Sequence, residues 1–315
     1  MRRALIVGIN DYEWAPLQGC INDANEVGNL LERHFDGTPN FDCKKLISSD
    51  REVTRTYLGK QIHQLFANQA DIALLYFSGH GAATDFGNYL VTQDALKFDE
   101  GIAMNDIMVL ANQSKAGEVI IILDCCYSGN MGNNPYSEFN MTTLREGVTV
   151  ITSSTDYQTS KERQGMGVFT RTICEALDGE AADLLGEVNI SGVYGYADKI
   201  FDSWQQRPVF KSHIASMTPI RKNKPKIDLK ILRRLPEYFE IEEKELPLSP
   251  SFEHSHDLAD EEKVSIFQNL QKCVAAGLVV PVGEEHMYYA AINSKSCKLT
   301  NLGQYYWKLA KGGRL

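Results

Sequence analysis

Four short runs of almost purely apolar residues place the strongest limit on how this chain can fold. A strand that is apolar at consecutive positions is covered on both faces, which is typical of a parallel sheet between layers of helices. Helix-like stretches separate the runs, roughly at 23–35, 53–67, 102–114 and 168–177. This alternation predicts an α/β/α sandwich around a mostly parallel sheet. The four runs are Ala4–Ile9, Ile72–Phe77, Val119–Leu123 and Val148–Thr152.

The pattern changes after about residue 220. A basic run at Arg221–Lys226 and a proline-containing stretch at Leu246–Asp257 are typical of linkers or surface loops. A helical pattern then runs from Asp260 to Gly277, and two strand-like pieces follow, at 278–282 and 287–292, before a last helix that Thr300 is placed to cap. We therefore expect a first domain at 1–220, a linker at 221–257 and a small C-terminal module at 258–315.

Charge and cysteine content limit the partner and the compartment. The formal charge is −9, and because residues 221–315 carry a net +2, the negative excess lies in residues 1–220. An acidic first part attracts cationic substrates and argues against nucleic acid as the main partner. The seven cysteines form no C-x-x-C pair, no signal peptide is apparent, and the apolar runs fall far short of the ~20 residues that cross a bilayer. We expect a cytoplasmic protein without a membrane partner.

Two segments place reactive side chains just past predicted strands. In YFSGHG (Tyr76–Gly81) glycines flank His80, and in LDCCYSG (Leu123–Gly129) the adjacent Cys125 and Cys126 follow the strand. A thiol becomes a thiolate near neutral pH when a base lies within hydrogen-bond reach, and parallel strands that end at one sheet edge bring such groups together. Each feature alone also fits a structural role, since buried cysteines usually behave as small hydrophobes.

The ordered motifs resemble the metacaspase and orthocaspase branch of the caspase-like cysteine peptidases, in its prokaryotic form. SGHG at Ser78–Gly81 and DCCYSG at Asp124–Gly129 correspond to the usual SGHG and D-x-C-H-S-G. The opening ALIVGIN is similar to that branch, as are GCINDA, GVFT and EALDGEA further along. The resemblance covers roughly Arg2 to Pro208, and the pentapeptide of animal caspases is absent.

This resemblance implies a caspase-like fold and a catalytic dyad. The second cysteine, Cys126, takes the role of nucleophile and His80 that of base, 46 residues upstream. Backbone N–H groups near Gly81 and Cys126 would bind the oxyanion. Tyr127 stands where the branch usually has histidine, which changes the rim of the site more than the dyad.

The resemblance also implies cleavage after Arg or Lys. By motif, the acidic pair and the serine of the S1 pocket fall on Asp23, Asp124 and Ser78, and Cys20 lines the same pocket. Paired carboxylates match the planar fork of a guanidinium and cancel its charge. Two structural interpretations stay open: Asp23 as the N-cap of a helix, with Glu26 completing a capping box, and Asp124 as a satisfied strand-end carboxylate.

Many metacaspases bind calcium. The nearest matches to the acidic ligands are Asp94, Asn105, Asp106 and Asn133. Asparagine in place of aspartate lowers the ligand charge and hence the affinity for a hard cation. We expect that no cofactor is required, with calcium as the alternative.

The C-terminal module resembles a winged helix through the pattern L-T-x-x-G before an aromatic helix, within Leu299–Ala310. DNA binding is one interpretation, but a net +2 favours an adaptor that receives an activating protein partner. The whole chain is thus interpreted as an activatable protease of a bacterial stress, cell-death or antiphage (antiviral) response. A catalytically inactive scaffold and a DNA-binding regulator are the alternatives. Loops containing Arg145, Lys161 or Arg163 are candidate sites of autocleavage.

Overall fold

The structure is a computed structural model that describes residues 1–125, 143–153, 162–163, 165–201 and 208–315. The chain divides into two compact units. The first unit comprises Met1–Ala182 and Glu187–Lys224, and the second comprises Asp183–Gly186 and Pro225–Leu315. Among the described residues, no helix is both long and apolar enough to cross a membrane.

A six-stranded sheet forms the centre of the first unit, in the order β12-β8-β7-β3-β1-β2. Every pair in it is parallel except β12 with β8, so the expected mostly parallel sheet is confirmed. All seven residues of β3 and of β7 are buried, which is why both strands are apolar along nearly their whole length. The strands are β1 (Arg2–Gly8), β2 (Asp42–Ile47), β3 (Ile72–Ser78), β7 (Glu118–Asp124), β8 (Val148–Thr152) and β12 (Val209–His213).

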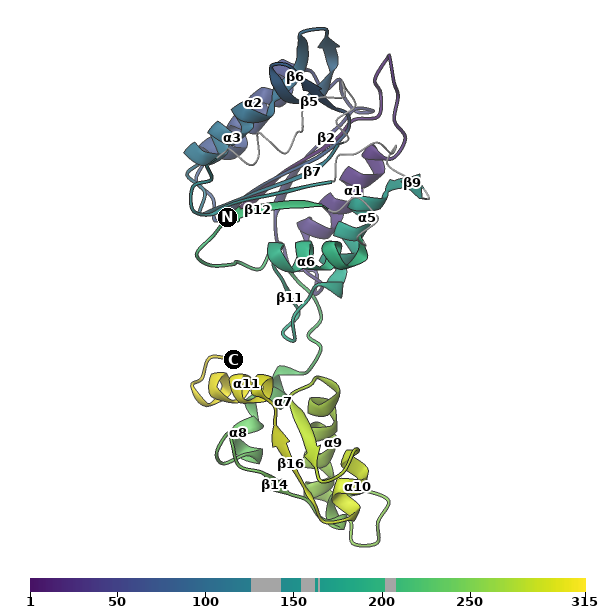
Figure 1. The fold of residues 1–315 in the computed structure, drawn as a ribbon, viewed down its shortest axis with the longest axis vertical. Coiled ribbons are helices and arrows are strands. Elements are labelled where there is room, and N and C mark those ends of the chain that lie inside the picture. Colours follow the sequence, from purple (N-terminus) through teal and green to yellow (C-terminus); the bar gives the residue numbers. More distant parts are fainter. Residues whose placement is uncertain (126–142, 154–161, 164, 202–207) are drawn as a thin grey trace. The chain divides into compact units, whose positions relative to one another are not determined.

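Helices cover both faces of this sheet (Figure 1). Side chains alternate along each strand, so Leu5 and Leu75 join the core beneath α2 and α3, whereas Ile6 and Leu74 join the core beneath α1, α5 and α6. The first layer is α2 (Arg55–Ala67) and α3 (Met104–Gln113); the second is α1 (Cys20–Glu32), α5 (Val168–Glu175) with the π-helical turn η1 (Ala176–Glu180), and α6 (Ile190–Ile200).

A separate antiparallel sheet begins one residue after His80, and the sequence patterns did not reveal it. Its strands are β4 (Gly81–Thr84), β5 (Gly87–Leu96) and β6 (Asp99–Ala103). Gly101, with φ of +140°, lies where an added Cβ would stand 2.2 Å from the carbonyl oxygen of Leu90, so only glycine permits this strand pairing. Two short pairs complete the first unit, β9 (Glu162–Arg163) with β10 (Met166–Gly167) and β11 (Glu187–Val188) with β13 (Arg221–Lys222).

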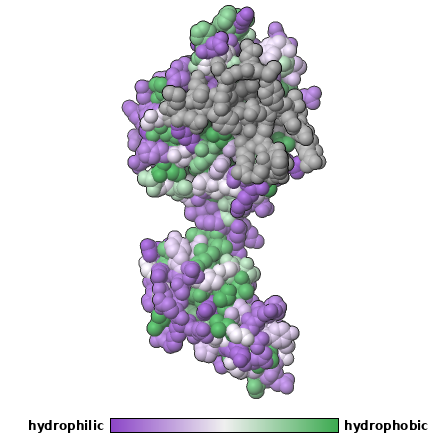
Figure 2. Space-filling view, in the orientation of Figure 1, coloured by the Kyte–Doolittle hydropathy of each residue, from purple (hydrophilic) through white to green (hydrophobic). Residues whose placement is uncertain are grey.

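The second unit has its own apolar core around a three-stranded antiparallel sheet, β14-β16-β15. Leu270, Leu278 and Trp307 are buried there, and Trp307 Nε1 donates to the Phe239 carbonyl oxygen at 2.8 Å. Hydrophobic residues are also visible among hydrophilic ones on the face of this unit in Figure 2. Its elements are α7 (Leu229–Arg233), α8 (Leu235–Tyr238), β14 (Leu246–Pro247), the 3₁₀ turn η2 (Pro250–Phe252), α9 (Glu261–Ala275), β15 (Val279–Val282), α10 (Met287–Ile292), β16 (Ser296–Leu299) and α11 (Asn301–Lys311).

Two helix ends in this unit follow the sequence pattern. Asp260 caps α9 by accepting from Lys263 N, and Thr300 caps α11 by accepting from Gly303 N. Gly277 takes the left-handed conformation, φ +72°, just past α9. The boundaries of both helices are therefore confirmed.

Two expectations for this region were wrong. Most of the segment expected to be a linker, 221–257, is folded: β13 belongs to the first unit and residues from Pro225 belong to the second, because Leu232, Leu235 and Phe239 are almost completely buried in its core. The stretch Met287–Ile292 is a helix rather than a strand, with its buried residues at helical spacing. The winged-helix interpretation stays a prediction.

Arg221 is a buried cation that joins the ends of two helical segments. The residue is 7% exposed; Nε donates to the carbonyl oxygen of Leu30 (2.8 Å), in the last turn of α1, and Nη1 donates to that of Leu177 (2.8 Å), in η1. Carbonyl groups at the end of a helix lack intrahelical partners and carry partial negative charge. Arg221 therefore holds together the C-terminal ends of α1 and of the α5–η1 segment.

We predict that Arg221→Met lowers the free energy of unfolding by about 3 kcal/mol, because two buried carbonyl oxygens lose a charged donor. Chemical denaturation followed by circular dichroism measures the change. The control is Arg33→Met, which removes an exposed arginine bonded to the Gly37 carbonyl oxygen and is expected to change stability by no more than about 0.5 kcal/mol. Equal losses in the two variants would contradict the role of Arg221.

Candidate active site

The carboxyl ends of β1, β3 and β7 bring the sequence motifs to one edge of the sheet. Gly8 pairs with Ser78, and Ser78 with Asp124. His80 follows Ser78 by two positions, and Cys126 follows Asp124 by two positions. Cys126 itself lies outside the described residues. The register thus supports the expected meeting of the two motifs, although the dyad remains a prediction.

His80 is held by the backbone and by two aromatic rings. Its Nε2 lies 2.7 Å from the carbonyl oxygen of Ala15, which can only accept, so Nε2 carries the proton and Nδ1 the lone pair. The imidazole stacks on Trp14 at 4.8 Å between ring centroids, with the ring of Tyr12 at 4.6 Å. This arrangement orients the imidazole without a carboxylate partner among the described residues.

Gly79 allows this close packing. A Cβ at Gly79 would stand 2.6 Å from the hydroxyl oxygen of Tyr12, which receives the backbone N–H of His80 (3.1 Å) and donates to the Val91 carbonyl oxygen (3.0 Å). The glycine before the histidine is therefore a steric requirement. Gly81 begins β4, and its part in an oxyanion hole stays a prediction.

Burial lowers the pKa of His80 from its usual 6.5, because desolvation disfavours the imidazolium; the hydrogen bond to Ala15 partly opposes this. The neutral form therefore predominates at neutral pH, which is the form that a general base needs.

Asp23 is not a helix cap. The helix α1 begins at Cys20 with Gly19 as N-cap, so the capping-box alternative is wrong. Asp23 is 2% exposed; its Oδ2 accepts from the Ser78 hydroxyl (2.9 Å) and its Oδ1 from the backbone N–H of Gly167 (3.0 Å). The structure thus brings together Asp23 and Ser78, which the sequence analysis assigned to one pocket.

The carboxylate of Asp124 also lies close to Gly167. Its Oδ2 accepts from the Thr170 hydroxyl at 2.6 Å, and a Cβ built on Gly167 would stand 2.8 Å from Asp124 Oδ2 and 3.2 Å from Asp23 Oδ2. Both carboxylates therefore converge on a position that only a missing side chain leaves open. Burial raises the pKa of Asp124, and the hydrogen bonds from Thr170 oppose that rise.

Two cysteines near the site, Cys20 and Cys125, are buried. Cys20, at the first residue of α1, is 8% exposed, and its carbonyl oxygen would lie 2.4 Å from a Cβ on Gly8, so the helix packs directly against β1. Cys125 is 3% exposed and belongs to the core beneath α2 and α3. A buried position for Cys125 is consistent with Cys126 as the nucleophile.

The suggested calcium ligands have other partners or lie exposed. Asp94 Oδ1 accepts from the backbone N–H of Arg55 (2.8 Å), in the first turn of α2, and from the Thr92 hydroxyl (2.7 Å). Asn105 and Asp106 are exposed on the first turn of α3. Asn133 lies outside the described residues, and within the described part of the chain no group of three or more His, Cys, Asp or Glu could hold a metal ion. The described members of this set therefore do not converge on a calcium site.

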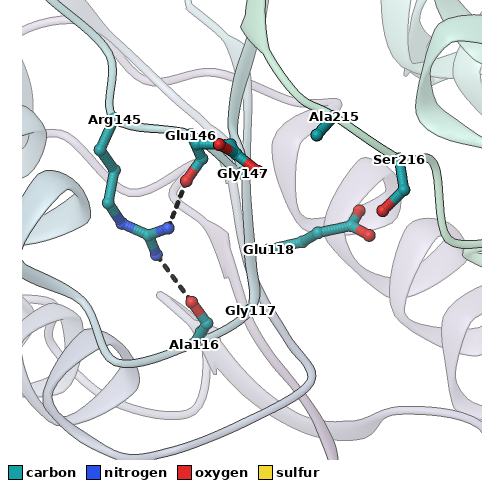
Figure 3. A pocket seen from close by; sticks show the side chains of 8 residues that line it. All are labelled: Ala116, Gly117, Glu118, Arg145, Glu146, Gly147, Ala215 and Ser216. Carbon is teal, nitrogen blue, oxygen red and sulfur yellow. Dashed lines mark hydrogen bonds between the residues drawn. The ribbon is translucent and has the colours of Figure 1, made fainter.

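A cavity of about 310 Å³ lies at the opposite edge of the sheet (Figure 3). Glu118 lines it at the first residue of β7, whereas Asp124 ends that strand. The Arg145 guanidinium there donates to the carbonyl oxygens of Ala116 and Glu146, and its backbone N–H donates to Asn112 Oδ1. Arg145 is thus held by three hydrogen bonds and makes a poor autocleavage site, since proteases cut exposed, mobile segments. Lys161 and the side chain of Arg163 lie outside the described residues.

Sequence reasoning missed several contributors to the site. The Ala15 carbonyl oxygen and the rings of Trp14 and Tyr12 orient His80. The Thr170 hydroxyl binds Asp124, and the Gly167 N–H binds Asp23. A backbone carbonyl leaves no trace in a sequence. The segment GVFT, which contains Gly167 and Thr170, was noticed only as a family match, and nothing in its pattern indicates a contact with β7.

Comparisons with known proteins agree with this arrangement. The family model described as the caspase domain matches residues 1–216. Metacaspase-3 from Trypanosoma cruzi (strain CL Brener) is 29% identical over 170 residues, which cover 46% of this chain and 45% of the relative. Metacaspase-1 from Mycosarcoma maydis is 27% identical over 161 residues, covering 43% and 37%. The chain thus spans less than half the length of these curated relatives.

A likeness of fold extends to a solved structure. The crystal structure of a protein from Geobacter sulfurreducens matches with a TM-score of 0.53 at 18% identity, covering 71% of this chain and 98% of that chain. The parallel sheet, its two helical layers and the histidine and acidic groups at one edge define a caspase-like α/β protein. With the match over residues 1–216, the chain belongs to the caspase-domain family of C14 peptidases, and metacaspases are among its relatives.

We predict that Trp14→Ala raises the pKa of His80 toward 6.5, because loss of the stacked indole admits water to the imidazole. An NMR titration of the His80 ring protons measures the shift. Phe86→Ala, which removes an aromatic ring that is 78% exposed between β4 and β5, is the control and is expected to leave the His80 pKa unchanged. A His80 pKa that stays the same or falls in Trp14→Ala would show that burial by Trp14 is not what lowers the pKa of His80.

Proposed function

We propose that this protein is a cysteine endopeptidase that cleaves after Arg or Lys, with Cys126 as nucleophile and His80 as base. One observation carries the proposal: the buried carboxylates of Asp23 and Asp124 converge on Gly167 at the sheet edge that also carries the His80 motif. The family match to caspase domains supports the reaction class.

The charge of this edge favours a cationic side chain. Two buried carboxylates close together repel each other and lose hydration, and a guanidinium or ammonium placed between them compensates both. Ser78, bonded to Asp23, adds a hydroxyl beside the same carboxylates. An aspartate side chain would meet repulsion here, so a preference for acidic P1 residues does not fit this chemistry.

The proposed reaction proceeds in two stages. His80 Nδ1 takes the thiol proton, and the Cys126 thiolate forms a C–S bond with the carbonyl carbon that follows Arg or Lys. The C–N bond breaks as His80 gives the proton to the leaving amine, and water then hydrolyses the thioester. Backbone N–H groups near Gly81 and Cys126 would stabilise the oxyanion by several kcal/mol.

The second unit is proposed to receive an activating protein partner. Its separate core and its exposed apolar side chains, including Ile241, Leu258 and Leu302, support an adaptor role. Service in a bacterial stress, cell-death or antiphage response is an association at the level of the fold. The inactive scaffold and the DNA-binding regulator remain the competing functions.

Fluorogenic peptides with Arg, Lys or Asp at P1 test the proposal, with wild type and Cys126→Ala and with either calcium or a chelator. We expect turnover of the Arg and Lys peptides that disappears in Cys126→Ala and does not require calcium. A preference for Asp would overturn the S1 assignment. Absence of turnover in every condition, including added candidate partners, would favour the scaffold, and salt-dependent retention on DNA would favour the regulator.

We further predict that Asp23→Asn and Asp124→Asn each lower kcat/KM for an Arg peptide about 100-fold, because each removes a charge-assisted contact to the P1 side chain. Asp71→Asn is the control, since Asp71 is exposed next to the opposite end of β3 and pairs with the N-terminal amine. It should keep wild-type kcat/KM. Loss of activity in the control alone, or in none of the three, would be inconsistent with the proposed pocket.

A further inference from the structure

Three side chains form a chain of hydrogen bonds that ends on Asp124. The Thr170 hydroxyl donates to Asp124 Oδ2 at 2.6 Å, and the Tyr76 hydroxyl lies 2.5 Å from Thr170 Oγ1. A threonine hydroxyl has one proton, and an ionised carboxylate can only accept. Because the Thr170 hydroxyl uses its one hydrogen to bond Asp124, the hydroxyl of Tyr76 must be the donor in its hydrogen bond with Thr170. The direction of both bonds is therefore set by the charge on Asp124.

Thr170 is the third residue of α5, so no carbonyl oxygen four residues back within the helix can accept from its hydroxyl. Thr172, two residues further on, does bond such an oxygen, that of Val168 at 2.9 Å. Thr170, also on α5, is fully buried and its hydroxyl instead reaches across to the end of β7. The bonded oxygen, Oδ2, is the one that converges with Asp23 Oδ2 on Gly167.

We propose that Thr170 is a positioning residue for substrate specificity: its hydroxyl, supported by Tyr76, holds Asp124 ionised and in one orientation for the basic P1 side chain. This inference rests on the proposed function. It adds a residue from α5 to a pocket otherwise assigned to α1 and to the ends of β3 and β7.

The surroundings of Asp124 make such a device necessary. Among the described residues, the titratable groups that face this site are Asp23 from α1, Tyr76 from β3 and Cys174 from α5, and none of these is a cation. Burial raises the pKa of Asp124, whereas the side-chain and backbone bonds from Thr170, and to a smaller extent the Ser153 hydroxyl, lower it. Burial also raises the pKa of Tyr76 far above its usual range, so Tyr76 keeps the proton that it donates. Within the described part of the chain, hydroxyl and backbone donors are therefore what favours the charged carboxylate before substrate arrives.

The test compares variants of the full chain with an Arg peptide across pH. Thr170→Val removes the hydroxyl and keeps the shape, so KM is expected to rise about tenfold or more while kcat changes less. Loss of a donor to the charged form raises the pKa of Asp124, so the acid limb of kcat/KM should move to higher pH by about one unit. Tyr76→Phe should shift both in the same direction by a smaller amount.

Two further variants separate the hydroxyl from general effects on the helix. Thr170→Ser keeps the donor and is expected to restore KM and the pH profile nearly to wild type. Thr172→Val removes another buried hydroxyl from α5, one bonded only within the helix, and should behave as wild type. A Thr170→Val enzyme that matches Thr172→Val, or a Thr170→Ser enzyme that fails like Thr170→Val, would overturn the inference.

A readout that needs no turnover keeps this result distinct from the proposed function. Carbon-13 NMR of labelled aspartate follows the Asp124 carboxyl, assigned by the loss of its signal in Asp124→Asn. We expect a higher Asp124 pKa in Thr170→Val and no change in Thr172→Val. If the wild type fails to cleave Arg and Lys peptides, the proposed function fails, and this titration alone decides whether Thr170 holds the carboxylate: an unchanged pKa in Thr170→Val rejects it.

Discussion

The burial of two carboxylates at one edge of the sheet is the constraint on which the rest of this site depends. Asp23 and Asp124 are almost inaccessible to water, so each needs hydrogen-bond donors that replace its hydration. Ser78, Thr170 and the backbone of Gly167 supply them from three different elements. Strands β3 and β7 and helices α1 and α5 must therefore meet closely, and the packing of the first unit follows from that requirement.

Three glycines let neighbouring segments of the first unit pack more closely than side chains at these positions would allow. Gly8 lets α1 rest on β1, Gly79 makes room for the Tyr12 hydroxyl beside His80, and Gly167 lets both carboxylates approach its backbone closely. At the far end of the same helices, Arg221 satisfies the carbonyl groups that α1 and η1 leave unpaired. The helices that carry the acidic site are thus fixed at both ends, which suits a pocket that must hold two like charges in place.

Local pattern revealed the buried strands but not every element around them. The strands β3 and β7 are apolar at almost every position, so their type and their ends were readable, and with them the placement of Ser78 and Asp124. The sheet β4–β6 was missed because its register depends on turns and on Gly101 rather than on an apolar run. Residues 225–257 were misjudged as a linker, because prolines and charged residues in this stretch alternate with the apolar side chains that fill a second core.

The sequence by itself determined the fold class and the family resemblance, because buried parallel strands and glycine-flanked motifs are local properties of the chain. The placement of His80, Ser78, Asp23 and Asp124 in one catalytic site was predicted from that resemblance. Only the tertiary structure decided how those groups are held. Asp23 accepts hydrogen bonds from Ser78 and Gly167 and does not cap a helix. Thr170 donates to Asp124, which lies 46 residues away in sequence. Such contacts arise where distant segments pack against one another, and no periodicity within a segment records them.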